Sequence, residues 1–250
     1  LATSNNQCFS QWAVEELGRE RLLEIFDRFG WLAPAAAGHE AGRVEEAETK
    51  LDLGRLGSGL DGLRVTPLHA VQLASILTHG RRIEPWWVDR VVDARGRSLE
   101  LPPRSAGRRV LSPDLARSLR SMLVSTTRRG TAKSAFQDRR GRRKLGAIDV
   151  AGKTGNLTGS DPFGRYEWFL GLAPAEDPTI AVVVLQLQSN LWWSRSSELA
   201  ADILRQVFCE RSGCRAELAS RWTGDLGPWA APLRVSDLAR TTGFTADAEP

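Results

Sequence analysis

Two short motifs in this sequence each contain polar side chains that could take part in chemistry. The first is an S-x-N triplet at Ser4 to Asn6, and the second is a K-T-G triplet at Lys153 to Gly155. A serine hydroxyl beside a lysine ammonium can relay a proton to or from a reacting atom. A lysine ammonium and a threonine hydroxyl can together bind a carboxylate, because both groups donate hydrogen bonds. Taken singly, each triplet is also typical of a helix-capping loop or of a solvated strand end.

Two other kinds of site fit these residues poorly. A phosphate-binding loop requires G-x-x-x-x-G-K-[ST], and the residue five positions before Gly152 is Ala147 rather than glycine. The three histidines, His39, His69 and His79, show no metal-ligand spacing. We therefore expect surface or packing positions for the histidines, and neither a metal nor a cofactor.

The K-T-G triplet lies within a region that predicts an antiparallel meander. Three segments have strand-like patterning and are separated by turns that contain Pro and Gly: 148–152, which leads into the triplet, 166–173 and 179–188. An amphipathic helix over 197–208 is expected to cover one face of this sheet. Trp192 and Trp193, just before that helix, are expected to pack in the core or at its rim.

Apolar spacing and capping residues predict the other helices. They lie within 8–30, where Gly18 divides two helices, over 67–79 after the cap Thr66, and from Pro113 to about Thr126. A short hairpin is expected over 87–97. Loops are expected over 1–7, over 33–63 and over the arginine-rich segment 127–144. The charges of this last segment are expected to be solvated, and the alternative is that they bind an anionic partner.

The bulk composition is that of a globular chain. The 250 residues include 42% hydrophobic and 26% charged residues and carry a net charge of +4, and the longest apolar run is far shorter than the roughly 20 residues that cross a bilayer. No zinc-finger, RNA-recognition or helix-turn-helix signature accompanies the positive charge, so nucleic acid is not an expected partner. Cys209 and Cys214 either form a disulfide in an oxidising compartment, which leaves Cys8 unpaired, or remain two free thiols.

Four further segments, read in order with the two triplets, resemble one protein family. They are 65–74 followed by Gly80, the G-T-A triplet at 130–132, 166–173 and 179–184. The set resembles the transpeptidase domain of penicillin-binding proteins, in the superfamily of serine D,D-transpeptidases and β-lactamases, whose S-x-x-K, S-x-N and K-T-G motifs surround one cleft. The resemblance covers Ser4 to Phe208. We therefore expect the C-terminal part of such a domain over 1–208 and a C-terminal extension over 209–250.

The resemblance implies an α+β fold with a five-stranded antiparallel sheet flanked by helices, here truncated at its N-terminus. It implies a peptidoglycan D,D-transpeptidase, in which a serine attacks a D-Ala-D-Ala peptide bond and the acyl group passes to an amine. The implied partners are peptidoglycan stem peptides, β-lactam antibiotics that imitate them, and cell-division or elongation machinery. The implied location is the periplasmic or extracytoplasmic face of the cell membrane, with an anchor upstream of this chain.

The resemblance also assigns roles to the residues of both triplets. Ser4 is expected to hydrogen-bond the catalytic lysine and to carry a proton toward the leaving group. Asn6 is expected to hold the substrate peptide and to keep that lysine in place. Lys153 supplies positive potential for the substrate carboxylate, and the Thr154 hydroxyl donates to the same carboxylate.

Gly155 and Asn156 complete the expected substrate strand. Gly155 has no side chain, so an extended peptide can lie against it. The backbone N–H of Asn156 is expected to be one of two oxyanion donors. The family most often has Thr or Ser after K-T-G, so Asn156 is a departure that we expect to affect substrate preference and β-lactam affinity.

The nucleophile motif S-x-x-K does not occur in this sequence. The residues three positions before its four lysines are Ala47, Gly130, Gly141 and Val150. Because the nucleophile precedes S-x-N in the family, we expect the isolated chain to be inactive. The alternative is a non-catalytic β-lactam-binding, peptidoglycan-binding or sensor module on a degenerate transpeptidase fold. A carboxypeptidase or β-lactamase would differ only in giving the acyl group to water.

Overall fold

The centre of the protein is a three-stranded antiparallel sheet. The computed structural model describes residues 1–88, 90–160, 162–188 and 194–221. The strands are β7 (Ala151–Ser160), β8 (Phe163–Ala173) and β9 (Ile180–Gln188), in the order β7-β8-β9. The predicted meander is therefore present. Of the five strands that the resemblance implies for this sheet, the described residues supply these three.

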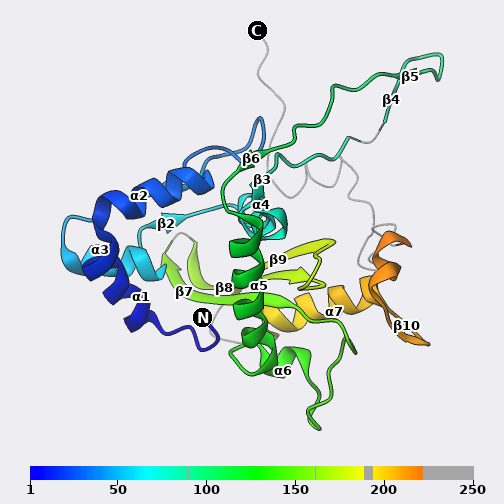
Figure 1. Ribbon diagram of the computed structural model, residues 1–250. Helices are drawn as coiled ribbons and strands as arrows, with labels where there is room; N and C mark the ends of the chain where they lie inside the picture. Colours follow the sequence, from blue (N-terminus) through cyan, green and yellow to red (C-terminus); the bar gives the residue numbers. More distant parts are fainter. Residues whose placement is uncertain (89, 161, 189–193, 222–250) are drawn as a thin grey trace.

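Helices cover both faces of the sheet, so the predicted α+β fold is confirmed (Figure 1). On one face lie α4 (Pro67–His79), against β9, and α5 (Pro113–Arg128), against β7. On the other face lies α7 (Ser196–Phe208). Both α4 and α5 begin as the sequence predicts. Thr66 caps α4, Ser112 caps α5, and each helix has a proline in its first turn.

Two apolar clusters attach these helices to the sheet and show which way the strand residues face. The fully buried Phe169 of β8 belongs to the cluster on the α7 side. Ala151 and Leu172 pack with α4 and α5 on the opposite side. Side chains alternate between faces along a strand, and directly opposed residues share a face. Thus Lys153, two residues after Ala151, lies on the α5 side, and Thr154, opposite Phe169, lies on the α7 side.

The helices at the start of the chain largely follow the sequence prediction. They are α1 (Asn6–Trp12), a π-helical turn η1 (Ala13–Leu17) and α2 (Gly18–Phe29), which ends at Gly30 with φ 80°. The loop predicted over 1–7 is too long, because α1 begins at Asn6. The side chain of Asn5 caps this helix and accepts a hydrogen bond from the backbone N–H of Cys8 at 3.0 Å.

The loop predicted over 33–63 is wrong in its second half, which contains α3 (Lys50–Ser58). Thr49 and Asp52 form a capping box, each side chain accepting from the other residue's backbone N–H. This T-x-x-D spacing is the signal that identifies the helix. The short strands β1 (Arg43–Val44) and β2 (Leu63–Arg64), which precede and follow α3 in the sequence, pair with each other.

A long extension between α4 and α5 projects from the body of the protein (Figure 1). At its base β3 (Arg81–Arg82) pairs with β6 (Arg108–Arg109), and farther out β4 (Val91–Val92) pairs with β5 (Ser98–Leu99). The hairpin predicted over 87–97 is therefore present, although each of its strands has only two residues.

After α7 the chain forms a small hairpin. β10 (Cys209–Glu210) pairs with β11 (Gly213–Cys214), and a disulfide joins Cys209 to Cys214, while Cys8 is free and exposed. Both bonded cysteines pack against the cluster on the α7 side, before the 3-10 helix η2 (Ala216–Arg221). Residues 222–250 of the predicted extension, and Trp192 and Trp193, lie outside the described residues.

His69 is a packing residue, which is one of the two roles, surface or packing, that are expected for the histidines. It is fully buried on α4, its Nε2 lies 3.1 Å from the carbonyl oxygen of Gly30, and its Nδ1 has no hydrogen-bond partner among the described residues. Burial lowers the pKa of His69, because the imidazolium loses hydration in the core.

Acidification is therefore expected to destabilise the domain through His69. Above the unfolded pKa of about 6.5 the histidine is neutral in both states, and below that value the unfolded chain binds a proton that the folded state resists. The free energy of unfolding should fall with decreasing pH from about 6.5, with a slope of at most about 1.4 kcal/mol per pH unit from this group. Urea unfolding between pH 8 and pH 5 measures the slope. His69→Gln should reduce it, while His79→Gln, at an exposed position on the same helix, should not; equal slopes in all three proteins would contradict the assignment.

Candidate active site

The structure brings one residue of each triplet into direct contact. Strand β7 carries Lys153, and the loop before α1 carries Ser4, which lies 149 residues earlier in the chain. The Lys153 Nζ donates to the Ser4 Oγ at 2.5 Å and to the carbonyl oxygen of Thr154 at 2.7 Å. The ammonium thus orients the Ser4 hydroxyl, whose own hydrogen stays available for donation to another group.

The loop that presents Ser4 is held in an unusual backbone conformation. Ser4 has φ 54°, which makes it the one non-glycine residue with positive φ among those that the structure describes. The loop is fixed by the turn at Gly130 and Thr131, because the Thr131 N–H donates to the carbonyl oxygen of Ala2 at 3.1 Å. A Cβ at Gly130 would lie 2.1 Å from the same oxygen, so only glycine permits this contact. The G-T-A turn therefore positions the S-x-N loop.

Asn6 is not joined to the other candidate residues. It is exposed at the first position of α1, and within the described part of the chain its side chain makes no hydrogen bond. Helix capping, the simpler role considered for this residue, belongs to its neighbour Asn5. The Asn6 amide is thus available to a ligand.

Thr154 contacts a residue to which sequence reasoning gave no role of its own. Its Oγ1 lies 2.6 Å from the Oγ1 of Thr131, the central residue of the G-T-A triplet. Because each hydroxyl has a single hydrogen, one of the two donates within this pair and the other can donate outward. The G-T-A motif is the signal from which a role for Thr131 could have been inferred.

Gly155 and Asn156 follow along the same strand, which is an edge of the sheet within the described residues. A Cβ at Gly155 would make an ordinary contact with Trp168 at 3.4 Å, so the chain's own packing does not require glycine there. Asn156 is exposed and lies opposite Glu167. The edge therefore leaves room for an extended ligand beside β7.

The electrostatics of the site are dominated by the Lys153 ammonium. Burial lowers its pKa, because the ammonium is partly removed from water. No ion pair to a carboxylate accompanies it anywhere in the part of the chain that the structure describes. An anionic ligand at this position would thus meet a positive charge that is not already neutralised.

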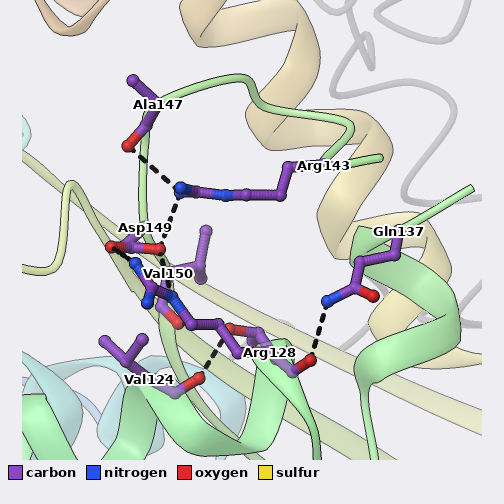
Figure 2. Close-up of polar contacts among 8 residues, drawn as sticks. Val124, Arg128, Gln137, Arg143, Ala147, Asp149 and Val150 are labelled. Atoms are coloured by element: carbon purple, nitrogen blue, oxygen red, sulfur yellow. Dashed lines mark hydrogen bonds and ion pairs between the residues drawn. The ribbon is translucent and has the colours of Figure 1, made fainter. Parts of the chain in front are cut away.

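A second polar cluster, behind the site, joins α5 to the start of β7 (Figure 2). Arg128, in the last turn of α5, donates from Nε and Nη2 to the two carboxylate oxygens of Asp149, at 2.9 and 2.5 Å. Arg143 donates to Asp149 at 2.7 Å and to the carbonyl oxygen of Ala147 at 3.0 Å. The segment 127–144, predicted to be a solvated loop, therefore contains structural ion pairs, and it also contains the short helix α6 (Lys133–Phe136).

No group of His, Cys, Asp or Glu side chains that could hold a metal ion occurs within the described residues. The polar groups of the site are hydroxyls, amides and one ammonium. Their arrangement suits the binding of a carboxylate together with proton transfer, which needs no cofactor.

Comparison with known proteins identifies the family of this chain. Residues 1–208 match the family described as penicillin binding protein transpeptidase domain. The peptidoglycan D,D-transpeptidase PbpA of Mycolicibacterium smegmatis is 27% identical over an alignment of 194 residues that covers 74% of this chain and 37% of that protein. Stage V sporulation protein D of Bacillus subtilis is 28% identical over an alignment of 193 residues that covers 68% of this chain and 27% of that protein. The chain thus spans well under half the length of these relatives.

Solved structures share the fold. The D,D-transpeptidase domain of a peptidoglycan glycosyltransferase from Eggerthella lenta gives a TM-score of 0.69 at 22% identity, with 82% of this chain and 51% of that chain covered. Penicillin-binding protein A of M. tuberculosis, solved as an imipenem acyl-enzyme complex, gives 0.67 at 20% identity, with 80% and 44% covered. With the match over residues 1–208, this chain belongs to the family of penicillin-binding protein transpeptidase domains.

Proposed function

We propose that this chain is the C-terminal part of a peptidoglycan D,D-transpeptidase that cross-links stem peptides by serine acyl transfer. The observation that carries the proposal is the hydrogen bond from Lys153 Nζ to Ser4 Oγ, which unites the K-T-G strand and the S-x-N loop at one point. The family match supports the same conclusion independently. The nucleophilic serine and the catalytic lysine of an S-x-x-K motif would come from a part of the protein that precedes this sequence.

In this proposal Ser4 relays the proton of the acylation step. The nucleophilic serine loses its proton to the catalytic lysine as it attacks the peptide carbonyl, and the C–N bond to the terminal D-Ala breaks. Lys153 donates to a lone pair of the Ser4 oxygen, so the hydroxyl hydrogen of Ser4 stays free to reach the leaving nitrogen. Ser4 then regains a proton from the catalytic lysine, which completes the transfer.

The strand β7 binds and orients the substrate. Lys153 and Thr154 hold its terminal carboxylate through an ammonium and a hydroxyl, and the peptide lies along the open edge beside Gly155. The backbone N–H of Asn156 supplies one oxyanion donor; a single such donor contributes about 3 kcal/mol to transition-state stabilisation. The Asn156 amide replaces the hydroxyl that is usual in the family and alters the contacts available to the carboxylate.

The proposed site of action is outside the cytoplasmic membrane, where peptidoglycan is assembled. The Cys209–Cys214 disulfide supports this location, because such bonds persist in oxidising compartments. Among the described helices, none has both the length and the apolarity needed to cross a bilayer. β-Lactams are proposed ligands of the same site, and an upstream membrane anchor and assembly with cell-division or elongation machinery remain predictions from the resemblance.

Labelling with a fluorescent penicillin, followed by mapping of the labelled peptide, tests the proposed function. In the full-length gene product we expect one labelled serine, in an S-x-x-K motif that precedes Leu1. The isolated 250-residue chain should give no adduct by intact mass, because it contains no S-x-x-K.

Two results would contradict this expectation in different ways. A folded full-length protein that takes up no label would favour the non-catalytic binding or sensor module. A stoichiometric adduct on the isolated chain would show that a serine within these 250 residues is the nucleophile, and the assignment of Ser4 as relay would then need revision.

A further inference from the structure

We propose that Asp149 is a positioning residue for the acyl-transfer site, because its carboxylate sets the distance between the Thr131 and Thr154 hydroxyls. The inference rests on the proposed function, since it concerns how that site binds the substrate carboxylate. Asp149 touches neither hydroxyl itself. It lies two residues before the start of β7 and accepts hydrogen bonds from Arg128 and Arg143 (Figure 2).

The first step leads from Asp149 to Thr131. Arg128 occupies the last position of α5, and its guanidinium meets the Asp149 carboxylate through two parallel hydrogen bonds. Such a two-point contact fixes orientation as well as distance. The carbonyl oxygen of Arg128 accepts from the Gln137 side chain at 2.7 Å, so the end of the helix is held from both sides. Thr131 follows three residues later, in a turn that the Ala132 N–H joins back to the Thr126 carbonyl oxygen at 3.1 Å.

The second step leads from Asp149 to Thr154. The backbone carbonyl of Asp149 accepts from the Ala175 N–H at 2.8 Å, and the next carbonyl, of Val150, accepts from the Thr127 hydroxyl at 2.7 Å. The start of β7 is thereby fixed to the turn after β8 and to α5. Thr154 is the fourth residue of that strand. Through Arg128, the Asp149 carboxylate adds to the Thr127–Val150 bond a second link between the two elements whose hydroxyls approach to 2.6 Å.

A second ion pair in the same loop provides a matched comparison. Asp138 accepts from Arg142 at 2.7 Å and from backbone N–H groups of its own turn, so this pair closes only a local loop. Neither Asp138 nor Arg142 contacts α5 or β7 through a hydrogen bond among the described residues. The same Asp-to-Asn change can thus be made at Asp149, where we expect it to affect the site, and at Asp138, where we do not.

The test uses the full-length protein and compares acylation by penicillin G with acylation by its methyl ester, which lacks the free carboxylate. Asp149→Asn keeps the shape of the side chain but loses its charge. We expect the ratio of the free-acid rate to the ester rate to fall about tenfold, because only the free acid uses the Thr131–Thr154 pair. Asp138→Asn should leave the ratio unchanged. A defect that only loosened the fold would lower both rates together.

A second variant keeps the test decisive if Asp149→Asn fails to fold. Arg128→Lys retains the positive charge but cannot make two parallel hydrogen bonds, and it should lower the same ratio. Equal losses for acid and ester, or no loss in either variant, would overturn the inference and leave the proposed function intact. A wild-type protein that penicillin does not acylate at all would overturn both.

Discussion

Replacing Lys153 with methionine is expected to lower the rate of penicillin acylation of the full-length protein by about 10³-fold. Methionine matches the length and the apolar stem of lysine but carries no charge and no donor. The change removes the positive charge that binds the substrate carboxylate and the hydrogen bond that orients Ser4. Stopped-flow or quenched-flow labelling with a fluorescent penicillin measures the rate directly.

The same substitution is not expected to destabilise the fold, and this separates a catalytic effect from a structural one. Because burial lowers the pKa of Lys153, the ammonium disfavours the folded state at every pH below that pKa. A neutral side chain removes this cost, which offsets the loss of the hydrogen bonds to Ser4 and to the Thr154 carbonyl, so the free energy of unfolding at neutral pH should change little. The cost in the wild type should diminish only as the pH increases toward the ordinary lysine value of about 10.4.

Lys50→Met is the control for the chemical change alone. Lys50 is exposed at the first position of α3, so its replacement should alter neither acylation nor stability measurably. An acylation rate for Lys153→Met within a few fold of wild type would show that the K-T-G strand does not bind the ligand carboxylate. The proposed mechanism would then be wrong, whatever the fold.

The sheet and the helices next to it could be predicted from the sequence because their signals are local. Thr66-Pro67 and Ser112-Pro113 mark helix starts within a few residues, and the strand over 179–188 shows its β-branched pattern within its own length. By contrast, α3 is short and lies in a segment rich in Gly and Ala. The capping box at Thr49 was its only clear signal, and composition concealed it.

Only some of the contacts of the site could be predicted from the sequence. The approach of Ser4 to Lys153 joins segments 149 residues apart, and only the resemblance to a family connected them in advance. The pairing of Arg128 and Arg143 with Asp149 was missed, because a run of arginines looks the same in sequence whether its guanidinium groups face water or a carboxylate. Tertiary packing decides between these outcomes.

Arg120 is another residue whose contacts could not be predicted from the sequence. Its replacement is expected to have the largest effect on stability. Arg120 lies on α5 with 5% of its surface exposed, and its guanidinium donates only to backbone carbonyl oxygens. The acceptors belong to the C-terminal end of α4 and to the turn after β8: Leu77, Thr78, Ala175 and Glu176. Such a role leaves no sequence pattern, because any residue can supply a carbonyl.

Burial lowers the pKa of Arg120, yet the group stays charged at every ordinary pH because the guanidinium is the most basic group among protein side chains. The charge is offset by the carbonyl dipoles at the end of α4, where a cation is favoured. Arg120→Met would leave these buried and partly buried carbonyls without this donor and remove the polar link between α4, α5 and the turn. We expect the free energy of unfolding to fall by about 3 kcal/mol.

Urea unfolding of the domain tests this value against two further variants. Arg120→Lys keeps the charge but reaches fewer carbonyls, so its loss should lie between wild type and Arg120→Met. Arg117→Met, one turn earlier on the same helix, removes only an exposed ion pair with Asp114 and should cost less than about 1 kcal/mol. If Arg120→Met and Arg117→Met proved equally mild, the guanidinium would not be what holds α4, α5 and the turn together. The packing of Leu77 of α4 and Leu123 of α5 against the apolar cluster on that face of the sheet would then be sufficient to hold them.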